Sequence, residues 1–311
     1  MQNTEEKRSK TKKLIICIST VLLCVLSVIL YYGKSLGLPD WNDVFVAFGL
    51  KADLNEDLSV CFVSVGTADA IYIHQGDTDV LIDTGTEKSY ESLDSFLKRY
   101  DCSSFDAVIV SHPDADHIGG MPDIIENYGT QTLYMYNYSE KLLPDTDKYV
   151  NFVNSVKENK VNTIYLSSAD EKQRCFSIGE MKFEVMSPYS EYSDTNDTSL
   201  VLKMRYGENS FLFTGDAGID VEEDLLSSGY DLKSDVLKVA HHGSKNSNSE
   251  EFLKVVSPKI SVISVGSENT YLPDFEVESR LADISELYVT LNDGNIVIKS
   301  DGKTLDVQTH V

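Results

Sequence analysis

The chain has 311 residues, and its 27 Lys and Arg against 50 Asp and Glu give a formal net charge of −23 at pH 7. Residues 1–32 carry five basic and two acidic side chains, a net of +3, so the remainder carries −26. This balance counts against tight, non-specific nucleic-acid binding, which needs a basic surface. The few cysteines and the length of the chain exclude a disulfide scaffold.

The N-terminal region predicts a membrane anchor. Residues 14–32 are uncharged and mainly apolar, and a helix of that length spans about 28 Å, close to the ~30 Å hydrocarbon core. The basic tail at 1–13 places the N-terminus in the cytoplasm by the positive-inside rule. We therefore expect one transmembrane helix, with the rest of the chain outside the cell membrane. A cleaved signal peptide, giving a secreted protein, is the alternative, although no small-x-small cleavage site follows residue 32.

Residues 33–57 are expected to form a linker, and 58–311 to form one domain of alternating strands and helices. Period-two and short apolar patterns predict strands at 58–65, 70–74, 78–82, 106–110, 132–136, 162–166, 181–186, 200–206, 210–213, 236–239 and 260–263. Amphipathic stripes predict helices at 87–100, 118–128, 147–158, 220–228 and 250–256. A final hairpin is expected at 288–299, turning at 292–294. These patterns alone indicate an α/β fold with much sheet.

The most informative motif is Ser-His-Pro-Asp-Ala-Asp-His-Ile-Gly-Gly at 111–120. It directly follows an apolar strand, where unpaired buried charge is costly. Imidazole nitrogen and carboxylate oxygen are ligands of Zn²⁺ and Mn²⁺, so the motif predicts a metal site. A solvated turn is one alternative, and a partial calcium loop is another, although the rest of the twelve-residue calcium pattern is missing.

Three further strands end in the same style. Residues 80–85 end in Asp-Thr-Gly, 211–216 end in Thr-Gly-Asp, and 236–243 end in Ala-His-His-Gly. Four strands that each end in Asp or His beside Gly indicate that the strand ends converge on one site.

At this point the chain resembles a known family. The order FVSVGTADA, LIDTG, SHPDADHIGG, NDTSLVLK, FLFTGDA and LKVAHHGS is similar to the metallo-β-lactamase superfamily, and within it to the extracytoplasmic hydrolase domain of the competence protein ComEC. The resemblance runs from about Leu58 to about Ile298. It implies a four-layer αββα sandwich, here behind the N-terminal transmembrane helix.

The resemblance also implies two divalent metal ions, Zn or Mn, that generate a bound hydroxide at neutral pH. His112 and Asp114 would face one ion, and Asp116 and His117 would face the other. Asp216 would bridge the two ions. Carbonyl or phosphoryl groups polarised by such a pair are open to hydrolysis.

The sequence does not decide which of two adjacent histidines is the remaining metal ligand. His241 would complete the second metal site, with His242 as the alternative. Asp83 would hydrogen-bond the loop that carries His112 and so fix ligand orientation, or it would be a plain turn residue. Asp69 has no clear role. The residues expected to be catalytic are Asp116, Asp216 and His241.

The chain departs from the family pattern in two places. It has no histidine between His117 and His241, and the stretch containing Asn196, Asp197 and Ser199 stands where many relatives have another ligand. The first metal site is then rich in oxygen ligands, which suits Mn²⁺ or a weakly held Zn²⁺. The late Tyr-Gly-His-Pro of ComEC-like domains reads Tyr-Leu-Pro-Asp at 271–274, without its histidine.

We therefore expect a membrane-anchored, extracytoplasmic, metal-dependent hydrolase of a phosphodiester, either a small molecule or nucleic acid. The net charge of −26 keeps a second function open, the hydrolysis of another ester such as a phosphocholine ester or a lactone. A third is a non-catalytic surface binding module on the same fold. No sequence feature indicates an obligate protein partner.

Overall fold

The computed structural model describes residues 2–32, 57–188 and 192–309. The chain divides into two units, Met1–Asp53 and Leu54–Val311, which are described separately. The linker predicted at 33–57 lies outside the described residues except for Asp57.

The first unit contains the helix α1 (Gln2–Tyr32), which joins the charged tail and the apolar segment in one element. Large apolar side chains such as those of Leu22 and Leu23 are exposed on it. Among the residues that the structure describes, no helix combines the length and the apolar character needed to cross a bilayer. The transmembrane anchor predicted at 14–32 is therefore not supported.

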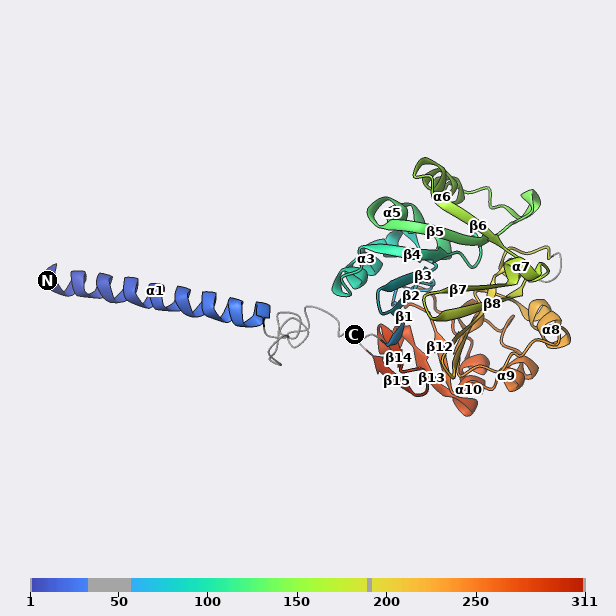
Figure 1. Cartoon of the computed structure of the whole chain (residues 1–311). Helices are drawn as coiled ribbons and strands as arrows, with labels where there is room; N and C mark the ends of the chain where they lie inside the picture. The colour runs from blue at the N-terminus through green and yellow to red at the C-terminus, as the bar shows by residue number, and fades with distance from the viewer. Residues whose placement is uncertain (1, 33–56, 189–191, 310–311) are drawn as a thin grey trace. The chain divides into compact units, whose positions relative to one another are not determined.

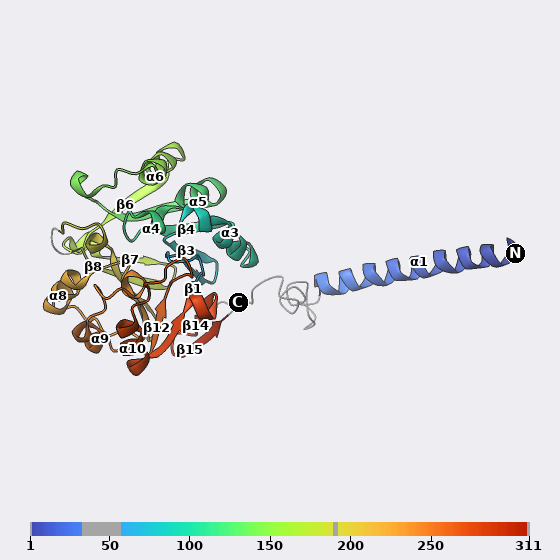
Figure 2. The same ribbon diagram turned by 180° about the vertical axis from the view of Figure 1, so that it is seen from behind.

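The second unit is built on two sheets that lie face to face (Figures 1 and 2). The first sheet has eight strands in the order β15-β14-β1-β2-β3-β4-β5-β6: β1 (Leu58–Phe62), β2 (Ile71–Gln75), β3 (Thr78–Ile82), β4 (Ser104–Ile109), β5 (Gly129–Tyr136), β6 (Asn162–Leu166), β14 (Ile296–Ser300) and β15 (Leu305–Thr309). The second has seven in the order β13-β12-β11-β10-β9-β8-β7: β7 (Cys175–Ile178), β8 (Met181–Ser187), β9 (Val201–Tyr206), β10 (Asn209–Phe213), β11 (Val236–Lys238), β12 (Ile260–Ile263) and β13 (Glu286–Val289).

Helices cover the outer face of each sheet (Figure 1). Beside the first sheet lie α3 (Tyr90–Arg99), α4 (Ala115–Ile118), α5 (Met121–Asn127) and α6 (Asp147–Glu158). Beside the second lie α8 (Ile219–Ser227), α9 (Glu250–Val256) and α10 (Phe275–Ile284). Shorter elements are η2 (Glu87–Ser89), η3 (Glu140–Leu142), α7 (Glu171–Arg174), η4 (Asn196–Thr198), η5 (Ala240–Gly243) and α11 (Thr290–Asp293). The predicted four-layer αββα sandwich is confirmed.

The strand period explains why two sheets form. Successive side chains of a strand point to opposite faces, so Val80 and Ile82 of β3 enter the core between the sheets with Phe211 and Phe213 of β10. Leu212 points the other way, into the layer under α8, α9 and α10. Most strands are therefore apolar on both faces, as expected for strands covered on both sides.

One predicted element is wrong. Residues 288–299 do not form a hairpin, because β13 pairs in parallel with β12 in the second sheet, whereas β14 pairs antiparallel with β1 in the first. The segment at 290–294, with α11, links the two sheets. Its turn residues satisfied the local hairpin pattern, but the pairing partners come from distant parts of the chain. The pattern also missed β7, β15 and α10.

Candidate metal centre

Four strand ends meet at one edge of the sandwich. They belong to the parallel pair β3–β4 of the first sheet and the parallel pair β10–β11 of the second. Gly119 and Gly120 let the loop after β4 touch the loop after β3, since a Cβ on Gly120 would lie 2.7 Å from the Thr84 carbonyl oxygen. The Leu200 N–H donates to the Ser111 carbonyl at 2.9 Å and joins the two sheets here. The predicted convergence of the four strand ends is thus visible in the structure.

The tightest cluster at this edge contains Asp116, His117, Asp216 and His242. Each offers one ligand atom, and these atoms all lie within 4.8 Å of one another. His117 Nε2 is 3.4 Å from Asp216 Oδ1, and His242 Nε2 is 3.5 Å from Asp116 Oδ2 and 3.6 Å from Asp216 Oδ2. We call these four residues the tight side of the centre.

The chemistry of the tight side fits a divalent metal ion. His117 Nε2, His242 Nε2 and Asp216 Oδ1 are buried without a hydrogen-bond partner among the described residues. Orphaned buried polar atoms are rare in folded proteins, because each one loses its hydration without compensation. Imidazole nitrogen and carboxylate oxygen together form a ligand set for Zn²⁺ or Mn²⁺.

Asp83 lies behind this cluster and fixes His117. Its Oδ2 is 2.8 Å from His117 Nδ1 and accepts a hydrogen bond from the Ser111 hydroxyl at 2.6 Å. Its Oδ1 accepts the Ser111 backbone N–H at 2.8 Å. With Nδ1 engaged in this way, the free Nε2 of His117 faces the cluster, which is how outer carboxylates orient metal-binding imidazoles. Asp83 thereby holds the loop that carries His112, as the resemblance implied.

The opposite side of Asp216 is more open. His112 Nε2 is 3.9 Å from Asp114 Oδ2, and His241 Nε2 is 3.9 Å from Asp216 Oδ2. The His241 side chain is 30 % exposed and borders a cavity of about 290 Å³ that Asp197 and Asp216 also line. We call His112, Asp114 and His241, together with the shared Asp216, the loose side of the centre.

The two adjacent histidines diverge because of their backbone. His241 and His242 both have left-handed conformations inside η5, with φ of 49° and 52°, which is uncommon and strained for residues other than glycine. The structure places His242, the alternative ligand in the sequence analysis, with Asp116 and Asp216. The His242 Nδ1 lies 2.8 Å from the Ser264 carbonyl oxygen and donates to it, which leaves Nε2 for the cluster.

A buried polar chain holds this strained turn. The Asn248 side chain accepts the Ala240 N–H at 3.1 Å and donates to the Ala240 carbonyl at 3.0 Å. Glu222 in turn accepts the N–H groups of Asn248 and Ser249. These contacts explain why two successive histidines can adopt left-handed conformations, because a strained backbone is stable only where the surrounding structure holds it in place.

The turn that carries Asp216 is held by η4 and the residue that follows it. The Ser199 hydroxyl accepts the Asp216 N–H at 3.0 Å, and Asp197 Oδ1 accepts the Gly218 N–H at 3.0 Å. Thus the stretch that replaces a family histidine positions the shared carboxylate through hydrogen bonds.

Burial and neighbouring charges shift the pKa values on the two sides differently. Burial, with the charge of His117, lowers the pKa of His112 to about 3. Burial alone would lower the pKa of His117 as well, but the carboxylates of Asp216 and Asp83 raise it well above its ordinary value. The pKa of His242 is also raised: burial opposes protonation, and Asp216, Asp116 and Asp69 outweigh it.

A buried ion pair supports the centre from below. Lys238 Nζ lies 2.7 Å from Asp69 Oδ2, and both side chains are almost fully buried. Lys238 also donates to the Val239 carbonyl at 3.0 Å. Asp69 Oδ1 has no hydrogen-bond partner among the described residues and lies 3.9 Å from His242 Nδ1. The Asp69 N–H donates to the Asp116 carbonyl at 3.2 Å, so the pair touches both ends of the tight side.

Comparison with known proteins places this geometry in a family. The family model described as Metallo-beta-lactamase superfamily matches residues 63–267, well over half of the chain. The chain belongs to the metallo-beta-lactamase superfamily. Its predicted enzyme class, a metal-dependent hydrolase, is confirmed by this membership together with the tight side of the centre.

Curated relatives of this superfamily member include competence proteins. ComE operon protein 3 of Bacillus subtilis (strain 168) is 30% identical over 266 residues, which cover 77% of this chain and 33% of the relative. Competence protein ComA of Neisseria gonorrhoeae is 26% identical over 84% of this chain and 35% of the relative. Recombination protein 2 of Haemophilus influenzae is 27% identical over 85% of this chain and 29% of the relative. The chain thus spans about a third of the length of these relatives.

Solved structures share the superfamily fold at low identity. Igni18, a metallo hydrolase of the archaeon Ignicoccus hospitalis, aligns with a TM-score of 0.50 and 15% identity over 77% of this chain and 98% of that protein. CmlA, a diiron beta-hydroxylase of Streptomyces venezuelae, aligns with a TM-score of 0.53 and 12% identity over 85% of this chain and 60% of that protein. These similarities support the fold.

All the sequence-predicted ligands lie at this one edge of the superfamily fold, on the tight or the loose side. Sequence reasoning missed the support behind them, above all Lys238, Asn248 and Glu222. The sequence did contain a signal for Lys238. This lysine lies inside the apolar strand predicted at 236–239, just before the histidine pair, and a lysine buried there needs a partner.

Proposed function

We propose that this protein hydrolyses phosphodiesters with the help of two divalent metal ions, held on the tight and the loose side of Asp216. The observation that carries the proposal is the convergence of two imidazole nitrogens and two carboxylates within 4.8 Å at the meeting point of both sheets. Three of their buried atoms, His117 Nε2, His242 Nε2 and Asp216 Oδ1, have no hydrogen-bond partner among the described residues, and one bound cation would satisfy all three.

The proposed division of labour follows from the contacts. Asp116, His117 and His242 would hold the ion of the tight side, His112, Asp114 and His241 would hold the other, and Asp216 would belong to both. Two dications in such a site polarise a phosphoryl group and activate water. Asp83, Ser111 and Lys238 would keep the ligands in place without touching substrate. Each side then combines two imidazole nitrogens with two carboxylates, a ligand set that suits either Zn²⁺ or Mn²⁺.

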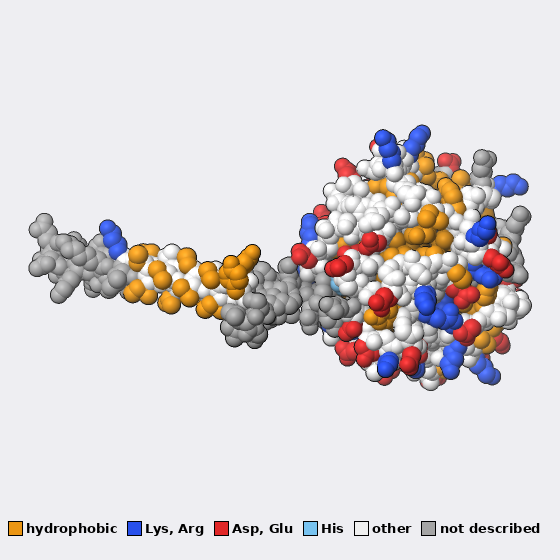
Figure 3. Space-filling model, viewed as in Figure 1, with side chains coloured by type: hydrophobic (Ala, Val, Ile, Leu, Met, Phe, Trp, Pro, Cys, Tyr) orange, Lys and Arg blue, Asp and Glu red, His pale blue; other side chains and the backbone are white. Residues whose placement is uncertain are grey.

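The substrate is proposed to be a small phosphodiester or a nucleic-acid strand. The relatives' names, competence and recombination proteins, favour nucleic acid. The surface favours a limited contact rather than a long track, since Lys and Arg are scattered among Asp and Glu on the face shown in Figure 3. A site that holds two dications inverts the local charge and can accept phosphate in an acidic protein.

A second candidate is hydrolysis of another ester, such as a phosphocholine ester or a lactone. The net charge of −23 supports it, because a strongly acidic protein repels polyanions at a distance. A substrate panel at one fixed metal concentration separates the candidates.

The test is metal content and hydrolysis by the purified protein beside Asp216→Asn, with Glu223→Gln, an exposed acid on α8, as the matched control. Bis-p-nitrophenyl phosphate and single-stranded DNA are supplied with Mn²⁺ or Zn²⁺. About two metals per chain and phosphodiester turnover that only Asp216→Asn abolishes would support the proposal. Bound metal with turnover only on carboxylic esters or phosphocholine esters would favour the second candidate. If the protein bound no metal at micromolar concentration, the result would favour a non-catalytic binding module on this fold.

A further inference from the structure

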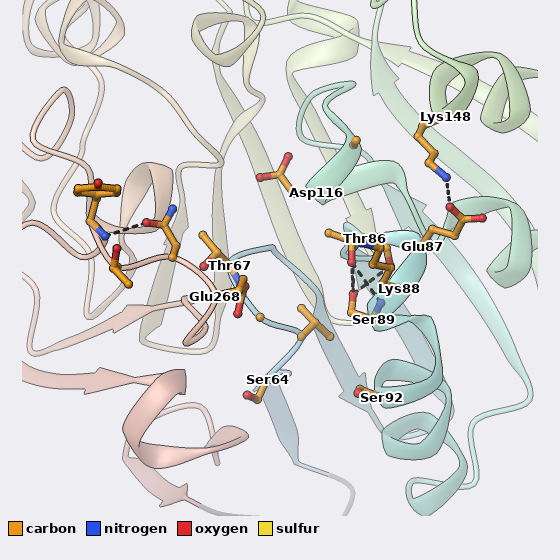
Figure 4. Close-up of a pocket in the computed structure, with 16 residues that line it drawn as sticks. Ser64, Thr67, Thr86, Glu87, Lys88, Ser89, Ser92, Asp116, Lys148 and Glu268 are labelled. Atoms are coloured by element: carbon orange, nitrogen blue, oxygen red, sulfur yellow. Dashed lines mark hydrogen bonds and ion pairs between the residues drawn. The ribbon is translucent and has the colours of Figure 1, made fainter.

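A cleft opens beside the tight side of the metal centre. It has a volume of about 950 Å³ and meets the cluster at Asp116, the one cluster residue among those that line it. In Figure 4, Glu87, Lys88 and Lys148 lie on one wall, and Thr67 and Glu268 lie on the other. The volume is at the upper end for ligand sites, so the cleft has room for more of a substrate than one phosphate group. We call it the Asp116 cleft.

The lining of the Asp116 cleft suits a polar ligand. Six serine and threonine side chains are among the residues that line it: Ser64, Thr67, Thr86, Ser89, Ser92 and Thr270. Hydroxyls both donate and accept hydrogen bonds, which matches the sugar and phosphate oxygens of a nucleotide better than an acyl chain.

One wall of the cleft is positively charged. Lys148 of α6 forms an ion pair with Glu87 of η2, whereas Lys88 forms no ion pair with any residue in the described part of the chain. Glu268 on the opposite wall already accepts the Thr67 N–H. A second anionic group of a ligand would therefore lie on the side of Lys88, away from Glu268.

An exposed aromatic ring stands at the edge of the other wall. Tyr271 is 87 % exposed, yet its loop is braced. The Tyr271 N–H donates to Asn269 Oδ1 at 2.9 Å, and the Gly266 N–H donates to Thr67 Oγ1 at 3.1 Å. The Asp274 N–H donates to the Gly243 carbonyl at 2.9 Å, which ties the loop to η5. An exposed ring on a fixed loop is a platform on which an unpaired base can stack.

We infer that the Asp116 cleft binds the nucleotide that neighbours the scissile phosphodiester of a single strand, with its base on Tyr271 and its other phosphate beside Lys88. This inference rests on the proposed phosphodiesterase function and adds the residues that select a strand. A duplex does not fit the role, because its bases are already stacked and paired. The contact is confined to one or two nucleotides, which reconciles strand binding with an acidic protein.

The experiment measures the contribution of the base to binding separately from that of the phosphate. Binding of a fluorescent phosphorothioate oligothymidylate, and of an abasic strand of equal length, is measured by anisotropy with Mn²⁺ and the full chain. The wild type should prefer the oligothymidylate about tenfold, the size of one base–aromatic stack. Tyr271→Ala should abolish that preference and leave the abasic strand unaffected. Lys88→Ala should weaken both strands and reduce the slope of log affinity against log salt by about 0.7, the value for one phosphate contact.

Matched controls are Phe275→Ala, which removes a ring that is 80 % exposed outside the cleft, and Lys254→Ala on α9. Both should bind as the wild type does. Unchanged binding in Tyr271→Ala and Lys88→Ala, or equal affinity of the wild type for the two strands, would overturn the inference. Hydrolysis of bis-p-nitrophenyl phosphate is followed in parallel, because its absence in the wild type would refute the proposed function whatever the binding result.

Discussion

The two sides of Asp216 differ in how closely their ligand atoms are already arranged in the metal-free protein. On the tight side, every ligand atom is within 4.8 Å of the others, and Asp83, Ser264 and the Asp69–Lys238 pair hold the ligands from behind. On the loose side, His112 and His241 each approach their nearest carboxylate only to 3.9 Å. Preorganisation lowers the cost of binding, so the comparison indicates one ion held firmly and one held weakly.

The largest effect is expected where the two sides meet. Asp216→Ala removes the one carboxylate that faces His117, His242 and His241. We expect loss of both ions and a fall in turnover of at least about a thousandfold, because the polarising charge disappears with the ions. Metal analysis and phosphodiester kinetics check this. Retention of one ion per chain would show that Asp216 serves a single side.

A buried pair supports only the tight side, and breaking it should be costly. Lys238→Met leaves Asp69 buried and uncompensated, which costs about 3–5 kcal/mol of unfolding free energy. Asp69→Asn combined with Lys238→Met should recover most of this loss. The control is Lys203→Met, since Lys203 is equally buried but its partner Asp231 is 66 % exposed and stays hydrated alone. Equal losses in Lys203→Met and Lys238→Met, measured by urea unfolding, would count against the account.

Replacing one histidine at a time sharpens the comparison. His242→Ala should weaken the first metal-binding step by at least about tenfold, since even groups behind the ligands contribute ten- to a hundredfold. His241→Ala should leave that step intact and weaken only the second. Calorimetric titration of the metal-free protein with Mn²⁺ resolves the two steps. If the two variants lose the same step, the division into a tight and a loose side is wrong.

The smallest expected effect is on pH dependence. In the metal-free protein, His117 and His242 have raised pKa values, so they carry protons that stabilise the fold at low pH. That stabilisation is lost as the pH rises through the raised pKa values, above the ordinary histidine value of about 6.5. Metal binding to the tight side must displace these protons and therefore tightens with pH.

The loose side offers the contrast, because the pKa of His112 is lowered to about 3 and its imidazole is already neutral. We therefore expect the first ion to release more protons than the second. Titrations in buffers of different ionisation enthalpy measure this. Equal proton release in both steps would contradict the assignment.

The sequence could indicate a candidate site at this edge because its signals are local. Each strand that ends in Asp or His beside Gly could be found within ten residues, and the parallel order of the strands brought those ends together. The choice between His241 and His242 could not be made locally, since two left-handed residues in succession follow from contacts with Asn248 and Glu222.

Pairing between distant segments set the other limit. Asp69 lies in the loop between β1 and β2 of the first sheet, whereas Lys238 lies in β11 of the second, and no local sequence pattern predicts that they meet. The turn at 292–294 had suitable residues for a hairpin, yet β13 pairs with β12 in the second sheet and β14 pairs with β1 in the first. Turn residues show only that the chain can reverse direction at that point. The packing of the two sheets decides which strands pair.

The position of β1 has a consequence for how the chain is made. β1 lies between β2 and β14, with Leu58 opposite Ser300, so the first strand of the unit stays unpaired on one edge until the last strands have left the ribosome. Closing such a long loop is slow, and an open strand edge invites association with other chains. Synthesis of this protein therefore includes a period in which nearly the whole unit has been translated but its first sheet is incomplete, and chaperones have most to protect during that interval.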